Sequence, residues 1–180
     1  MNNIILYIAK PNEEIKYYFT SVLEAYNLKK IESNYFSLSV DDIDSAIESI
    51  SAASQEFYLD VSCYIEEIEL PIEYKDYIYL FLKEKQNGIY RLKDIIEDAV
   101  LKNDVTFKNE IKKYFSHKLS NEVIETALVF IETGNSIKAS KELYIHRNTL
   151  NYRLDTVKKI TSLDLKNFID QFAFYGLFKS

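Results

Sequence analysis

The feature that most constrains this chain is the segment spanning residues 135–154, whose pattern predicts two short helices joined by a tight turn. We expect Ser136 to cap the first helix, because a serine side chain accepts hydrogen bonds from free helix amides. Ala139 and Ser140 are small enough to let two helices cross closely. Tyr144 and Ile145 are the predicted turn. The segment therefore predicts a helix-turn-helix.

The second helix of this motif is predicted over residues 146–160. At 100° per residue, Leu150, Leu154 and Val157 fall on one face and form a buried stripe. The residues that we expect to contact DNA lie away from that stripe or on the first helix: Arg147, Asn148, Thr149, Asn151, Tyr152, Arg153, Lys138, Lys141 and His146. The first turn of such a helix reaches deepest into a major groove. The pattern thus predicts a recognition helix.

Each side-chain type in this set suits one kind of contact. Arg147 and Asn148 can make bidentate hydrogen bonds to guanine and adenine edges. Thr149 and Tyr152 can contact a thymine methyl, a sugar or a phosphate, while Arg153, with Lys138 and Lys141, is predicted to hold the phosphate backbone. For His146, a position near phosphates is favoured over a metal or catalytic role, because the other histidine lies before a different helix.

The charge distribution supports this prediction. The net charge is −6, but residues 136–160 hold six basic and two acidic side chains, a balance of +4. Nineteen lysines accompany only three arginines, and two of these, Arg147 and Arg153, lie in the predicted recognition helix. Arginine offers a planar donor fork that lysine lacks. The basic surface is therefore concentrated where DNA contact is predicted.

The pattern alone leaves open an ordinary pair of surface helices, and a resemblance favours the DNA-binding alternative. The run Ile-His-Arg-Asn-Thr-Leu-x-Tyr-Arg-Leu at residues 145–154 resembles the C-terminal DNA-binding domain of PucR-family bacterial regulators, which include CdaR-type sugar-diacid regulators. It is also similar to the Fis-type helix-turn-helix, whose pattern is met at Ala139, Leu143, Ile145, Arg147, Thr149 and Leu150. The resemblance covers roughly residues 120–180.

The resemblance implies a dimer, with Arg147, Thr149 and the surface from residue 151 to residue 153 touching DNA. Two departures from the family pattern stand out. Ser140 replaces a second alanine, and the N-terminal 120 residues are shorter than the usual sensor and linker regions. The sequence therefore leaves open whether a small-molecule effector binds to this chain. The effectors of the family are not assigned to it.

The N-terminal region alternates strand and helix patterns. We predict β-α-β-α-β within the first 68 residues, with Asp41 as a helix cap, then helices near residues 71–86, 92–101, 106–115 and 120–131. The predicted fold class is α+β, with a small α/β N-terminal region followed by an all-α helix-turn-helix domain. Residues 1–118 would form the regulatory or dimerisation region and residues 119–180 the DNA-binding domain.

Several classes of protein and site are disfavoured by the composition. Cys63 is the only cysteine, so an intrachain disulfide and a cysteine metal cluster are excluded, and a buried, inert thiol is expected. The isolated glycines form no phosphate loop, and two distant histidines assemble no catalytic or metal site. We predict no enzyme, no metal and no cofactor. A signal peptide and a membrane span are not predicted, which favours a cytoplasmic protein.

The final segment, residues 168–178, is apolar around most of its predicted helix, and one part of it is interpreted as a dimer contact. The predicted function is a sequence-specific, DNA-binding transcriptional regulator that acts as a homodimer on double-stranded DNA. The alternative is an interaction adaptor, in which the same fold binds a partner regulator in place of DNA.

Overall fold

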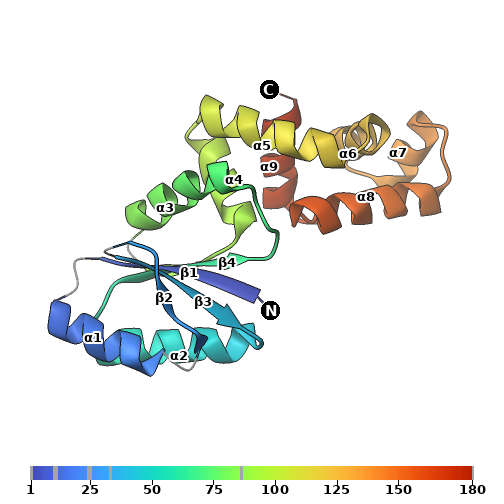
Figure 1. Ribbon diagram of the computed structural model, residues 1–180. Helices are drawn as coiled ribbons and strands as arrows, with labels where there is room; N and C mark the ends of the chain where they lie inside the picture. Colours follow the sequence, from blue (N-terminus) through green and yellow to red (C-terminus); the bar gives the residue numbers. More distant parts are fainter. Residues whose placement is uncertain (1, 10–11, 24–25, 33, 86, 180) are drawn as a thin grey trace. The chain divides into compact units, whose positions relative to one another are not determined.

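The computed structural model describes residues 2–9, 12–23, 26–32, 34–85 and 87–179, with the backbone alone at residues 15, 16 and 18 (Figure 1). The chain divides into two compact units, Met1–Leu92 and Lys93–Ser180. The first unit holds a mixed sheet with helices and the second holds helices. This arrangement confirms the predicted α+β fold class.

A five-stranded sheet in the order β2-β3-β1-β4-β5 forms the centre of the first unit. Strand β1 (Asn2–Ile8) pairs antiparallel with both β3 (Tyr35–Val40) and β4 (Val61–Glu66), and Leu6 lies opposite Phe36 and Cys63. The short strands β2 (Lys29–Lys30) and β5 (Gly88–Tyr90) form the two edges. Strand β5 runs parallel to β4.

Both faces of this sheet are covered by helices. Helices α1 (Glu13–Val22) and α2 (Ile43–Glu56) lie on one side, and α3 (Lys75–Glu84) lies on the other (Figure 1). Alternate residues of β1, such as Ile4 and Leu6, are fully buried against Phe19 of α1 and Ala46 of α2. This two-sided burial follows from the apolar character of β1 and β4.

The predicted β-α-β-α-β order is confirmed, with local corrections. Helix α2 is capped by Asp42 instead of Asp41, and the Asp42 side chain accepts hydrogen bonds from the Asp44 and Ser45 amides at 3.0 and 3.3 Å. The helix predicted over residues 71–86 begins as a 3₁₀ turn, η2 (Ile72–Tyr74), and ends at Glu84. Gly88, just beyond the predicted end of that helix, begins β5. Strands of two and three residues are too short to show an alternation of apolar side chains.

The second unit contains six helices: α4 (Leu92–Leu101), α5 (Val105–Lys118), α6 (Asn121–Thr133), α7 (Ser136–Glu142), α8 (Arg147–Thr161) and α9 (Phe168–Phe178). Ser120 caps α6, because its hydroxyl accepts a hydrogen bond from the Val123 amide. Gly134 ends α6 at φ 61°, a left-handed conformation that glycine adopts without steric cost. Asn135, and not the predicted Ser136, caps α7 through the amides of Ile137 and Lys138.

The division between the units lies earlier than the boundary predicted near residue 118. Helix α5 packs against α8 and α9, and its side chains Phe107, Ile111 and Phe115 are at most 2% exposed. These contacts are tertiary, so the amphipathic pattern of α5 indicates a buried face without identifying what covers it. Residues 93–118 thus belong structurally to the helical unit. The roles predicted for the two regions stay predictions.

The connection from α8 to α9 is held by carboxylates. Lys158 forms an ion pair with Asp164 at 2.8 Å, and the Asp164 amide donates to the Asp170 carboxylate at 2.7 Å. Asp170 is 3% exposed, and its second oxygen, Oδ1, has no hydrogen-bond partner among the described residues. Burial raises the pKa of Glu97, and the neighbouring charges of Asp94 and Asp170 raise it further.

We expect Glu97→Gln to stabilise the helical unit at neutral pH. Because the folded pKa of Glu97 lies above its ordinary value of 4.5, its contribution is most favourable below that value and is lost as pH rises through the folded pKa. Glutamine removes this charge and offers an amide N–H donor to the Asp170 carboxylate. Urea unfolding from about pH 4 to pH 7 should show a smaller loss of stability with rising pH in the variant than in the wild type. An identical pH dependence in both proteins would contradict the prediction.

Candidate nucleic-acid interface

Helices α6, α7 and α8 pack against one another and form the helix-turn-helix. The predicted stripe of α8 is buried: Leu150 and Val157 are fully covered, and Leu154 is 6% exposed. On α7, Ala139 and Ser140 are also buried, as expected for a close helix crossing. Burial of Leu150, Leu154 and Val157 stabilises the position of α8 by roughly 1.5–3 kcal/mol for each side chain. The opposite face of α8 is consequently turned outward.

The turn between α7 and α8 contains Tyr144 and Ile145, as predicted. The Ile145 amide donates to the Ser140 carbonyl at 3.0 Å, which closes the turn, and Tyr144 has φ 54°. Tyrosine rarely adopts this left-handed conformation, where glycine is favoured. The Tyr144 side chain is 97% exposed beside the N-terminus of α8. It is a candidate contact residue that the sequence prediction assigned to the turn alone.

Most of the predicted contact residues are exposed. On α8 these are Arg147, Asn148, Thr149 and Asn151, together with Tyr152, which is 72% exposed. Lys138 and Lys141 of α7 are exposed as well. The structure therefore places the guanidinium, amide and hydroxyl groups predicted for DNA contact on the outer surface of the motif.

His146 has a defined structural role at the start of α8. It is the N-cap residue, and its Nδ1 accepts the Asn148 amide at 3.2 Å. A cap of this kind satisfies one of the free amides of the first turn. The side chain is exposed. His146 thus fixes the first turn, in which Arg147 and Asn148 lie.

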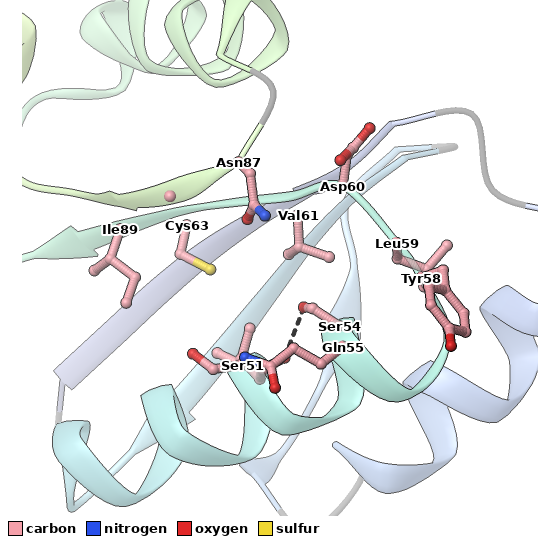
Figure 2. Close-up of a pocket in the computed structure, with 12 residues that line it drawn as sticks. Ser51, Ser54, Gln55, Tyr58, Leu59, Asp60, Val61, Cys63, Asn87 and Ile89 are labelled. Atoms are coloured by element: carbon pink, nitrogen blue, oxygen red, sulfur yellow. Dashed lines mark hydrogen bonds between the residues drawn. The ribbon is translucent and has the colours of Figure 1, made fainter.

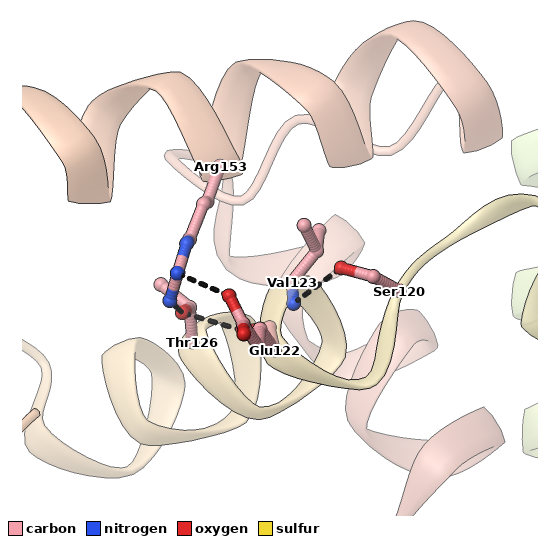
Figure 3. A network of polar contacts seen from close by, with 5 residues as sticks. All are labelled: Ser120, Glu122, Val123, Thr126 and Arg153. Atoms are coloured by element: carbon pink, nitrogen blue, oxygen red, sulfur yellow. Dashed lines mark hydrogen bonds and ion pairs between the residues drawn. The ribbon is translucent and has the colours of Figure 1, made fainter.

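Arg153 differs from the other predicted contact residues. Its guanidinium lies against α6, where Nη2 meets the Glu122 carboxylate at 2.5 Å and Nη1 donates to the Thr126 hydroxyl at 3.0 Å (Figure 3). Its side chain is 20% exposed. The expected outward contact with phosphates is therefore not what the structure shows for Arg153. The sequence indicated its charge but could not indicate its partners on another helix.

The first unit contains a separate cleft of about 600 Å³ between α2 and the β4–β5 side of the sheet (Figure 2). Ser51 and Gln55 of α2 face Cys63 of β4 and Ile89 of β5 across it. Cys63 is 2% exposed, as predicted, and burial raises the pKa of its thiol to about 12. Burial therefore favours the neutral form of this thiol.

The residues of the helix-turn-helix match a known family model over 123–178, the PucR C-terminal helix-turn-helix domain. This part of the chain is a PucR-type helix-turn-helix domain. The predicted resemblance to PucR/CdaR-type regulators is confirmed. The match begins within α6 and ends with α9, so it covers the three packed helices and the final helix.

Three named regulators are similar to part of this chain. The DNA-binding transcriptional activator AdeR of Bacillus subtilis (strain 168) is 36% identical over 93 residues, which are 49% of this chain and 21% of AdeR. The proline-responsive transcriptional activator PutR of the same organism is 34% identical over 86 residues, 45% of this chain and 20% of PutR. The carbohydrate diacid regulator of Escherichia coli (strain K12) is 51% identical over 39 residues, 22% of this chain and 10% of that protein. The matches thus span about a fifth or less of these relatives.

A solved structure shares the fold over nearly the whole chain. It is the crystal structure of a regulator of polyketide synthase expression from Bifidobacterium adolescentis, with a TM-score of 0.56 and 12% sequence identity. The similarity covers 98% of this chain and 78% of that one. At 12% sequence identity, the similarity shows a shared fold only.

Within the ranges that the structure describes, no three or more His, Cys, Asp or Glu side chains gather in a way that could hold a metal ion. Across the same residues, no helix combines the length and the apolar character needed to cross a membrane.

Proposed function

We propose that this chain is a sequence-specific DNA-binding transcriptional regulator that inserts the N-terminal half of α8 into the major groove. The observation that carries this proposal is the outward presentation of Arg147, Asn148 and Thr149 on the first turn of a helix held from behind by buried leucines. The family match and the relatives named as transcriptional regulators support it.

The proposed contacts divide into base reading and backbone holding. Arg147 and Asn148 read guanine and adenine edges through bidentate hydrogen bonds, and Thr149 and Asn151 contact neighbouring bases or phosphates. Lys138, Lys141, His146 and Tyr152 contact the sugar-phosphate backbone. Asp155 is exposed two turns into α8 and repels phosphates, so base reading ends before it.

We also propose that the regulator acts as a homodimer. Helix α9 presents exposed side chains, Phe168 (79%), Ile169 (53%) and Phe172 (43%), on the helical unit. The same unit has a groove of about 430 Å³ lined by Ile124, Leu128 and Val129 of α6 and bordered by Lys179. The exposed α9 side chains and the α6 groove belong to the same unit. In a two-fold dimer, the α9 side chains of each copy can therefore fill the α6 groove of the other copy. Two copies would then read half-sites about 34 Å apart.

The dimer surface can be tested with Phe168→Asp and Phe172→Asp. A carboxylate buried at this contact without a partner costs about 3 kcal/mol in each copy, so we expect dimer affinity to fall by at least about 100-fold. Sedimentation equilibrium should then report the monomer mass at micromolar concentration. Phe174 is fully buried in its own unit, so a charge there would test folding instead.

The matched control for this experiment is Leu101→Asp, which changes a side chain that is 73% exposed on the same unit but outside α6 and α9. It should leave the mass unchanged. A wild-type protein that sediments as a monomer, or a Phe172→Asp protein with the wild-type mass, would contradict the proposed surface.

Selection of duplexes from a random pool, followed by sequencing, tests the DNA-binding function itself. The proposal requires enrichment of a motif, and a homodimer should enrich two inverted half-sites. Failure to enrich any motif at about 50 mM salt, where phosphate contacts are strongest, would reject sequence-specific binding. Capture of a partner regulator in that case would favour the adaptor alternative. The effector and the cytoplasmic location stay predictions.

A further inference from the structure

The polar network around Arg153 joins the recognition helix to α6 (Figure 3). Besides meeting Glu122 and Thr126, it includes a hydrogen bond from the Thr126 hydroxyl to the Glu122 carbonyl at 2.7 Å. Thr126 is fully buried, whereas the Glu122 side chain is 74% exposed. The Arg153 guanidinium therefore spans from the interior of the helix pair to its surface.

The Arg153 guanidinium already hydrogen-bonds to α6, and a contact with a phosphate would have to replace these hydrogen bonds. Nη1 and Nη2 each hold a different partner on α6. Turning the group toward DNA would break a charged hydrogen bond and leave the buried Thr126 hydroxyl without its donor. Hydrogen bonds to charged groups are stronger than those between neutral groups, and a buried hydroxyl that loses its donor is destabilising, so this rotation is unfavourable.

The leucine stripe and the arginine fork constrain α8 differently. Apolar burial is non-directional, so Leu150, Leu154 and Val157 keep α8 against its neighbours without fixing its rotation tightly. A planar guanidinium that meets two acceptors is directional. The fork can therefore fix the angle at which α8 presents its first turn.

We infer that Arg153 is a positioning residue, which acts on DNA recognition by locking the rotation of α8 against Glu122 and Thr126 and not by neutralising a phosphate. This inference rests on the proposed DNA-binding function. It assigns the two arginines of the recognition helix to different tasks, base reading for Arg147 and orientation for Arg153. It also gives a function in DNA recognition to Glu122, an acidic residue that would otherwise oppose DNA.

The salt dependence of binding distinguishes positioning from phosphate contact. Each neutralised phosphate contributes about 0.9 to the slope of log K against log salt. We expect Arg153→Gln to weaken binding to the selected operator by about tenfold at every salt concentration, with an unchanged slope. The matched control is Lys141→Gln, a proposed phosphate contact on α7, which should lower the slope by about 0.9 for each copy of the chain. A loss of slope in Arg153→Gln equal to that of the control would overturn the inference.

Two further variants test the same point through the partners of the fork. Arg153→Lys keeps the charge but cannot reach two acceptors with a planar fork, so we expect it to remain as weak as Arg153→Gln. Restoration of wild-type affinity by lysine would show a simple charge contact. Glu122→Ala should also weaken binding, although it removes a negative charge, and combining it with Arg153→Gln should add no further loss. Stronger binding by Glu122→Ala would overturn the inference.

A measurement without DNA separates this inference from the function on which it rests. Amide hydrogen exchange across residues 147–153 should quicken by about tenfold in Arg153→Gln and stay at the wild-type rate in Lys141→Gln. Unchanged exchange in Arg153→Gln would reject the anchoring of α8. If exchange quickens while the wild-type protein binds no duplex, the proposed function fails and the anchoring stands.

Discussion

Replacing Arg147 with alanine should weaken binding to the selected operator by about 1–3 kcal/mol for each copy of the chain, or about 5- to 150-fold, because a bidentate contact with a guanine is lost. Arg147 is exposed on the first turn of α8. Its removal should therefore leave the melting temperature nearly unchanged, as is usual for exposed positions away from caps and cores. Fluorescence anisotropy with operator and with scrambled duplex measures both affinity and specificity.

Lys159→Ala serves as the control for Arg147→Ala, because Lys159 is an exposed cation in the last turn of the same helix. It should have little effect on specificity, since the proposed base contacts lie in the first turns. Equal discrimination between operator and scrambled duplex by Arg147→Ala and the wild type would reject Arg147 as a base-reading residue.

Replacing Phe115 with alanine should destabilise the helical unit by about 3–5 kcal/mol, the range for removing a buried aromatic side chain. Phe115 is fully buried in α5, and α5 packs against α8, the proposed recognition helix, and against the final helix α9. The loss should reduce DNA binding indirectly, through the fraction of folded protein. Urea unfolding followed by helical circular dichroism measures the effect.

Two comparisons make the Phe115 experiment specific. Leu101→Ala removes an apolar side chain that is 73% exposed and should cost less than about 1 kcal/mol. A fragment of residues 93–180 should unfold cooperatively, whereas a fragment of residues 119–180, cut at the boundary predicted from sequence, should lose this cooperativity with α5. Equal stability of the two fragments would show that α5 is dispensable.

The sequence predicted the elements with strong local signals. The buried stripe of α8 repeats at helical spacing, Ser120 and Gly134 mark the ends of α6, and the alternation of β1 and β4 with helices is visible in the apolar pattern. The edge strands β2 and β5 and the caps at Asp42 and Asn135 were missed or displaced. Such short features depend on a few hydrogen bonds and not on a repeating pattern.

By itself the sequence determined the helix-turn-helix, most of its outward residues and its family resemblance, because helical periodicity and residue chemistry are local properties. The tertiary structure alone decided that α5 belongs with the helical unit and that Arg153 faces Glu122 and Thr126. Residues 122 and 153 are distant in the chain, and their side chains meet only after α6 and α8 have packed. A linear pattern records the charge of an arginine, whereas its partner is set by the crossing of two helices.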